Sequence, residues 1–184
     1  MNNTSTSIRM LLTITVVTGL AYPLAVTGAA KAFWPTQAEG SLVQSGGKTV
    51  GSHLLSQETK TDKYFWARPS AAGFNASAST GSNYGPTSAA LKKAVDDRRS
   101  AMEKAHGPGP VPEDLLYASA SGLDPHVSPA AARYQVARVA AARKMDAAKL
   151  LALVDSRVEG PQFGLFGEPR VNVLDLNLAL DAQP

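Results

Sequence analysis

The chain of 184 residues contains no cysteine, and it has few long apolar runs and no internal repeat. A protein without cysteine is compatible with either side of a membrane, so the compartment must be inferred from other features. Acidic residues are absent before Lys31. Only one window of the chain is uncharged and long, and the rest is hydrophilic, which makes that window the main clue to the organisation of the protein.

The uncharged window runs from Met10 to Ala30. At a rise of about 1.5 Å per residue, a helix of this length spans the roughly 30 Å hydrocarbon core of a bilayer. We therefore predict three parts: a short cytoplasmic N-terminus over 1–9, a transmembrane helix over 10–34 and an extracytoplasmic domain over 35–184. The domain is long enough for one hydrophobic core but not for two.

A cleaved secretory signal is the alternative for this window. Signal peptides have an apolar core of about 7–15 residues before a small-residue cleavage site, and Ala30-Lys31-Ala32 is a passable site. The window is longer than that, and Phe33-Trp34 suits the outer interface of a spanning helix. We predict that the helix is retained, whereas cleavage would make the protein a secreted binding module.

Two further features concern the anchor. Arg9 and Lys31 flank its two ends, so the charge asymmetry barely decides the orientation, but the short N-terminus implies that the N-terminus is inside and the domain outside. Thr15, Gly19 and Pro23 recur at a spacing of four, and small faces let membrane helices approach closely. This face is a candidate contact with partner helices, with ordinary Gly and Pro usage in membrane spans as the alternative.

The basic composition does not indicate a nucleic-acid partner. The chain has 18 Lys and Arg against 15 Asp and Glu, and its pI is 9.2. Arg9 and Lys31 belong to the anchor, which leaves 16 basic and 15 acidic residues in the domain. A nearly neutral domain does not attract a polyanion strongly.

The pattern of the domain predicts a small α+β fold. A strand is expected over Thr49–Leu55, a loop over Gly73–Pro86 and a helix over Thr87–Ala105. Ser128 is expected to cap a second helix with Pro129 in its first turn, and Asp146 a third. Leu174, Leu176, Leu178 and Leu180 alternate with other residues, and this period of two predicts a C-terminal strand.

No catalytic, metal or cofactor motif survives inspection. Asp124, His126 and Ser128 supply the residue types of a hydrolase triad, but they lie two apart around prolines, and Ser128 serves better as a cap. A membrane-tethered hydrolase using Ser128 and His126 is kept as the alternative function. Ser45–Thr49 ends like a phosphate-binding loop but has Leu42 where glycine is needed. The three histidines lack metal-ligand spacing.

What remains is a cluster of aromatic and polar residues. The run Tyr64–Pro69 and the loop Gly81–Thr87 combine aromatics with Arg68 and Asn83, and exposed aromatics with arginine favour protein interfaces. The candidate partner contacts of the domain are Tyr64, Phe65, Trp66, Arg68 and Asn83. The alternative is that the aromatic side chains fill the core.

Several stretches resemble the KdpC family, the C subunits of bacterial Kdp potassium-transporting ATPases. The most specific is Ser121-Gly122-Leu123-Asp124-Pro125-His126-Val127-Ser128-Pro129. Others are 50–57, 64–71, 81–87, 111–115, 118–120 and 171–174, so that the likeness covers nearly the whole chain. It departs from the family pattern at Ser56, Tyr84, Ser88 and Ala120, none of which bears an assigned catalytic role.

The resemblance implies a single-pass protein of the bacterial inner membrane that is not an enzyme by itself. Its implied partners are a channel-like potassium-binding subunit and a P-type ATPase subunit, with a small single-helix subunit as a further candidate. ATP is implied as a cofactor of the complex, and the family is described as a catalytic chaperone that raises the ATP affinity of the pump subunit. A domain outside the cytoplasm cannot contact ATP directly, so such an effect would be coupling between distant sites.

Overall fold

The computed structural model describes residues 3–183, so residues 1, 2 and 184 of the predicted terminal segments lie outside the described part. The chain divides into two compact units, one up to Val50 and one from Gly51 onward. We describe each unit separately. The first contains the anchor and most of a β-hairpin, and the second contains the domain with the hydrophobic core.

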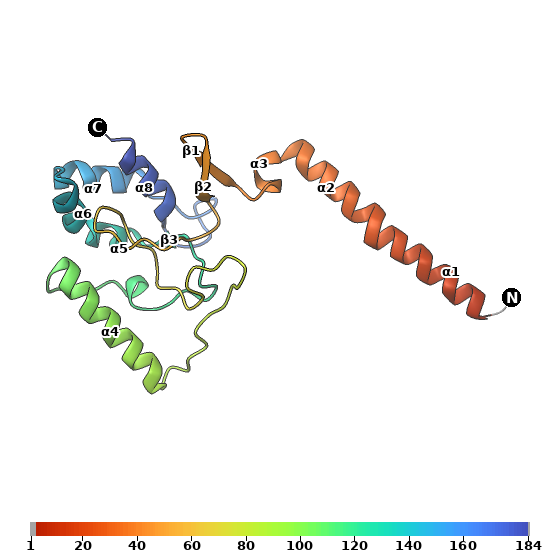
Figure 1. The fold of residues 1–184 in the computed structure, drawn as a ribbon, viewed down its shortest axis with the longest axis horizontal. Coiled ribbons are helices and arrows are strands. Elements are labelled where there is room, and N and C mark those ends of the chain that lie inside the picture. Colours follow the sequence, from red (N-terminus) through yellow and green to blue (C-terminus); the bar gives the residue numbers. More distant parts are fainter. Residues whose placement is uncertain (1–2, 184) are drawn as a thin grey trace. The chain divides into compact units, whose positions relative to one another are not determined.

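The first unit is dominated by one continuous helical run (Figure 1). It consists of the α-helix α1 (Asn3–Val16), the π-helical turn η1 (Val17–Ala21) and the α-helix α2 (Tyr22–Phe33). These 31 residues are long and apolar enough to cross a membrane, and none of the window is buried inside the protein. A retained membrane-spanning helix is therefore compatible with the structure by length and composition.

The π-helical turn has an identifiable cause. Pro23 has no N–H to donate to the carbonyl of Gly19, and its ring would clash with that carbonyl in a regular α-helix. The chain responds with a wider turn, in which the N–H of Tyr22 donates to the carbonyl oxygen of Val17, five residues earlier. The Thr18 hydroxyl donates to the carbonyl oxygen of Ile14 at 2.7 Å, inside the same helical run.

After a short helix, α3 (Pro35–Ala38), the chain forms a hairpin of β1 (Leu42–Ser45) and β2 (Lys48–Ser52). Gly46 and Gly47 form the two-residue turn with φ of 56° and 76°, which glycine adopts without steric cost. The predicted strand is confirmed, although it ends at Ser52. The Ser45–Thr49 stretch is a hairpin turn and not a phosphate-binding loop, because a strand and not a helix follows Lys48.

The second unit is a mixed helix and strand domain, which confirms the α+β prediction. Its elements are α4 (Ala89–His106), the 3₁₀ turn η2 (Glu113–Leu115), β3 (His126–Val127), α5 (Pro129–Tyr134), α6 (Val136–Arg143), α7 (Ala147–Ser156), β4 (Val171–Asn172) and α8 (Val173–Asp181). The short strands β3 and β4 are antiparallel, with His126 opposite Asn172. Helix α7 contacts α5, α6 and α8, and α4 contacts α6. Figure 1 shows α6, α7 and α8 close together and α4 at the edge of the domain.

Three helices begin where the sequence predicts. The Ser88 hydroxyl accepts a hydrogen bond from the N–H of Leu91, and the Ser128 hydroxyl accepts one from Ala131 at 3.1 Å. The Asp146 carboxylate accepts one from Ala148 at 2.8 Å. The second predicted helix is divided at Gln135 into α5 and α6, and Lys144 ends α6 in a left-handed conformation with φ of 57°. The predicted loop over 73–86 contains neither helix nor strand.

The C-terminal strand prediction is wrong, because residues 173–181 form the helix α8. The side chain of Asn172 accepts hydrogen bonds from the N–H groups of Leu174 and Asp175, which starts the helix. The residues that become buried are Val173, Leu176, Ala179 and Leu180, at the i, i+3 and i+4 spacing of a helix face. Leucine favours helices. The alternating leucines also place apolar residues on one face of a helix, so the alternation alone could not distinguish a strand from a helix.

One core holds the second unit together. It combines buried residues from every helix of the unit with Phe65 from the extended segment that precedes them. Leu150, Val154, Leu176 and Leu180 from α7 and α8 are each 0% exposed. The buried ring of Phe65 therefore ties the extended segment to this core, which positions the site described next.

Candidate partner-binding site

The aromatic segment Tyr64–Trp66 is extended, and two side-chain amides take the place of neighbouring strands. The Nδ2 of Asn177 donates to the carbonyl oxygen of Phe65 at 3.0 Å, and its Oδ1 accepts from the Phe65 N–H at 2.8 Å. Gln135 makes the same pair of bonds with Trp66, at 3.1 and 2.7 Å. Buried backbone groups need such partners, so these two amides hold the segment between α5 and α8.

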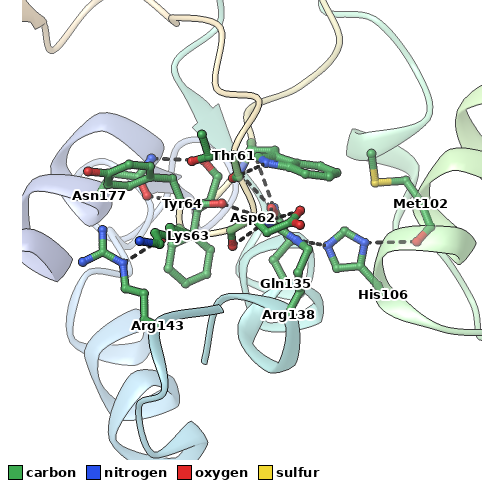
Figure 2. Close-up of polar contacts among 12 residues, drawn as sticks. Thr61, Asp62, Lys63, Tyr64, Met102, His106, Gln135, Arg138, Arg143 and Asn177 are labelled. Carbon is green, nitrogen blue, oxygen red and sulfur yellow. Dashed lines mark hydrogen bonds and ion pairs between the residues drawn. The ribbon is translucent and has the colours of Figure 1, made fainter. Parts of the chain in front are cut away.

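Arg138 is the centre of this arrangement (Figure 2). Its guanidinium donates to the carbonyl oxygens of Asp62 and Tyr64 at 2.8 and 3.0 Å, and to Gln135 Oε1 at 2.9 Å. It also lies over the Trp66 ring, 3.9 Å from the centroid. The side chain is only 4% exposed. Burial lowers the pKa of Arg138 to about 10. Because this value is still well above neutral pH, the side chain remains cationic.

A second arginine holds the neighbouring part of the segment. Arg143 Nε donates to the carbonyl oxygen of Lys63 at 2.7 Å, and its guanidinium lies 4.7 Å from the centroid of the Tyr64 ring. It also pairs with Asp181 at the end of α8. Together, Arg138, Arg143, Gln135 and Asn177 form what we call the clamp of the aromatic segment.

The aromatic side chains of this segment differ in how accessible they are to a partner protein. Phe65 is 0% exposed, so its ring fills the core and offers no surface, which is the alternative left open by the sequence. Tyr64 and Trp66 are half-buried. Asn83 is exposed in a left-handed conformation with φ of 53°. Contact of these exposed side chains with a partner stays a prediction.

His106, at the end of α4, completes the network. Its Nε2 accepts a hydrogen bond from Arg138 Nε at 2.9 Å, so its Nδ1 carries the proton and donates to the carbonyl oxygen of Met102 at 3.1 Å. The imidazole therefore has to be neutral. Burial lowers the pKa of His106, and the positive charge of Arg138 lowers it further, although the bond to Met102 opposes both effects.

This network makes stability sensitive to acid. In the unfolded chain His106 takes up a proton near pH 6.5, whereas in the folded domain it does so only at lower pH. The contribution of His106 to the free energy of unfolding is thus fully present above about pH 6.5. It is lost as the pH falls from there through the lowered pKa of the folded domain. We expect His106→Gln, which keeps an acceptor for Arg138, to lose less stability than the parent between about pH 7.5 and about pH 5. Urea unfolding at both pH values measures the difference, and equal losses would contradict the assignment.

The residues of the possible hydrolase triad line an open cleft, and His126 Nδ1 lies 3.5 Å from Asp124 Oδ1, but Ser128 is engaged elsewhere. Asp124 Oδ2 accepts from Arg68 at 3.0 Å, and Asp124 Oδ1 accepts from the N–H of His126 at 3.0 Å. The Ser128 hydroxyl caps α5, and within residues 3–183 no hydrogen bond joins it to His126. The cleft measures about 600 Å³ and is lined by Arg68, Asp114, Asp124, His126, Val127, Ser128, Pro129, Ala130, Glu168, Pro169 and Arg170. Ser128 lacks the hydrogen-bonded base that a nucleophile requires.

The predicted small-residue face of the anchor lies on one exposed helical run. Thr15 is in α1, Gly19 is in η1 and Pro23 is in α2. The π-helical turn includes an extra residue, so their relative directions differ from those in the straight helix that the spacing of four assumed. A Cβ added at Gly19 would meet nothing within 4 Å in this chain. Their contact with partner helices stays a prediction.

Sequence inspection missed the residues that hold the site. Gln135 and Arg138 stand among the buried alanines and valines of α5 and α6, and polar side chains in such a stretch indicate buried hydrogen bonds. The sequence therefore contained a signal for these buried polar residues. It could not show their hydrogen-bond partners, because Gln135 bonds to Trp66, 69 residues away, and Asn177 to Phe65, 112 residues away. Among the described residues no three His, Asp or Glu side chains gather in a way that could hold a metal ion.

Comparison with known proteins matches nearly the whole chain. The family described as "K+-transporting ATPase, c chain" matches residues 4–182. A potassium-transporting ATPase KdpC subunit of Dechloromonas aromatica is 53% identical over 181 residues, covering 96% of this chain and 95% of that protein. The KdpC subunit of Variovorax paradoxus is 58% identical, covering 92% and 90%, and that of Methylococcus capsulatus is 51% identical, covering 98% of each.

Proposed function

This chain belongs to the KdpC family, as its sequence motifs predicted, and on that basis we propose that it is a non-catalytic accessory subunit of an ATP-driven, high-affinity potassium uptake complex. The observation that carries the proposal is the match itself. It runs over 91% or more of this chain in every named relative, at 51–58% identity, and all of them are potassium-transporting ATPase KdpC subunits.

The proposed partners are a channel-like potassium-binding subunit and a P-type ATPase subunit, with a small single-helix subunit as a third. In this arrangement the anchor crosses the inner membrane once with its N-terminus inside, and the domain lies outside. The 31-residue apolar helix supports a single crossing, and the short N-terminal segment before it supports this orientation. The exposed side of Tyr64, Trp66, Arg68 and Asn83 is the proposed contact of the domain.

We also propose that the subunit stabilises assembly and raises the affinity of the pump subunit for ATP. With the domain outside, the effect on ATP has to be indirect. The anchor and the domain would bind one conformation of the pump better than another, and a preference of about 1–3 kcal/mol would shift ATP affinity about 5- to 150-fold. What this role requires is different contacts with the two conformations of the pump, since only differential affinity can shift their equilibrium.

Growth at low potassium tests the proposal. A strain that lacks its own copy of this subunit should grow poorly at micromolar external potassium, and expression of the full chain should restore growth. A chain without residues 1–34 should not, because the domain would lose its membrane attachment. All strains should grow equally in millimolar potassium, which is the control. Restoration by the anchorless chain, or normal growth without any subunit, would contradict the proposal.

A further inference from the structure

The segment between α7 and β4 forms a narrow hairpin with an apolar end. Glu159 and Arg170 pair through two backbone hydrogen bonds of 2.8 and 3.0 Å and through an ion pair of 3.0 Å. Nearer the end, the N–H of Gln162 donates to the carbonyl oxygen of Phe166 at 2.8 Å, and the N–H of Phe166 donates back at 2.9 Å. The side chains beyond this second pair belong to Phe163 and Leu165. We call Phe163, Leu165 and Phe166 the apolar tip.

The apolar tip is exposed to an unusual degree. Phe163 is 90% exposed, Leu165 76% and Phe166 63%. Two phenylalanines and a leucine present apolar surface on the order of a few hundred Å², which is the size at which patches on monomers are often functional. None of the three contributes to the hydrophobic core of the domain. Packing of the domain core therefore does not explain why this turn carries three large apolar side chains.

The tip is held in a defined and strained shape. Phe163 has φ of 55°, a left-handed conformation that costs a bulky residue on the order of 1 kcal/mol or more. Gly164 and Gly167 follow with φ of 72° and 85°, which glycine accepts freely. Hydrogen bonds from Gly164 to Pro161 and from Leu165 to Gln162 close the turn. A preordered tip loses little conformational entropy when it binds.

The charges near the tip favour a protein partner over a lipid surface. Segments that bind the bilayer surface carry Lys or Arg beside their apolar residues and are commonly anchored by Trp or Tyr. Between Val158 and Pro169 this chain has neither basic residues nor Trp or Tyr. Glu159 is paired with Arg170, and within the described chain no ion pair is formed by Glu168. The tip is therefore apolar with one acidic neighbour.

We propose that the apolar tip inserts into an apolar groove with a basic rim on a membrane-embedded subunit of the same complex. The two phenylalanines and Leu165 fill the groove, and Glu168 faces the basic rim. This inference rests on the proposed function, because it needs the complex as its partner, and it adds a contact outside the aromatic segment. Aromatic anchors that enter a preformed pocket commonly dominate the binding energy of an interface.

Photo-crosslinking in the intact complex tests the inference. The photoreactive residue p-benzoylphenylalanine is placed at Phe163 or Phe166 of the full chain, which is expressed with the other subunits and irradiated in membranes. A matched control places it at Tyr117, an aromatic residue that is 42% exposed in the same unit. We expect the tip positions to crosslink to a membrane-embedded subunit and the control to do so at least about tenfold less. Crosslinks only to lipid or only to a second copy of this chain would overturn the inference.

A second variant separates this inference from the proposed function. The triple variant Phe163→Ser, Leu165→Ser, Phe166→Ser removes only exposed side chains, so its thermal unfolding should match that of the parent. Its retention in the purified complex should fall at least about tenfold. If the parent chain assembles and the variant assembles equally well, the tip is not an anchor and the proposed function stands. If the parent itself does not assemble, the proposed function fails.

Discussion

Replacing Arg138 with methionine is expected to lower the free energy of unfolding of the domain by about 3–5 kcal/mol. The change leaves the carbonyl oxygens of Asp62 and Tyr64 and the Nε2 of His106 without their buried donor. It also removes the cation from the Trp66 ring. Unsatisfied buried acceptors are costly because no water replaces the lost partner. Urea unfolding of the full chain, followed by Trp66 fluorescence in a Trp34→Phe background, measures the loss.

Two matched variants make this result specific. Arg133→Met changes an arginine on the adjacent helix whose ion pair with Asp155 is about half exposed, and it should cost less than about 1 kcal/mol. Arg138→Lys keeps the charge but presents a point donor in place of a planar fork, so it should restore only part of the loss. If Arg138→Met were as mild as Arg133→Met, the clamp would not hold the aromatic segment.

Gly19→Leu is expected to reduce the amount of this chain that co-purifies with its membrane partners at least about tenfold. A side chain at Gly19 meets nothing within 4 Å in this chain, so the substitution leaves the helix itself undisturbed. Leucine also favours insertion into the bilayer, so the anchor remains in the membrane. The loss would therefore come from a partner helix that packs closely against this position.

The matched control is Gly28→Leu, which makes the same change in the same helical run. A Cβ at Gly28 likewise meets nothing within 4 Å, and five residues after Pro23 it is rotated about 140° around α2 from that residue. It should leave co-purification within about twofold of the parent. Quantified pull-down of the detergent-solubilised complex compares the two. Equal losses at both glycines would point to bulk anywhere on the helix, and no loss at either would remove the proposed face.

Local signals in the sequence predicted the starts of the helices correctly. Ser128 and Asp146 act as caps because their side chains reach N–H groups two or three residues away, a geometry that needs no distant partner. The hairpin turn at Gly46 and Gly47 was not predicted, although it too is a local structure. The C-terminal segment was misjudged, because alternating leucines fit a strand and also place enough apolar residues on one face of a helix.

The site depended on contacts that local patterns do not encode. The sequence indicated that Tyr64, Phe65 and Trp66 mattered, but it could not decide which of them faced the interior. That choice is made by Gln135, Arg138 and Asn177, which approach the segment from helices far along the chain. The exposed tip at Phe163 was overlooked for a similar reason, since an apolar residue in a loop can be buried by any neighbour.

The amino-acid sequence alone therefore predicted the long apolar N-terminal helix, the α+β class, the helix caps Ser128 and Asp146 and the family. These follow from composition, from hydrogen bonds between near neighbours and from motifs read along the chain. The tertiary structure decided that Phe65 is core, that the tail is a helix and that Arg138 organises the aromatic segment. The physical reason is that burial and long-range hydrogen bonds depend on which distant side chains fill the space around a residue, and that space exists only in the folded domain.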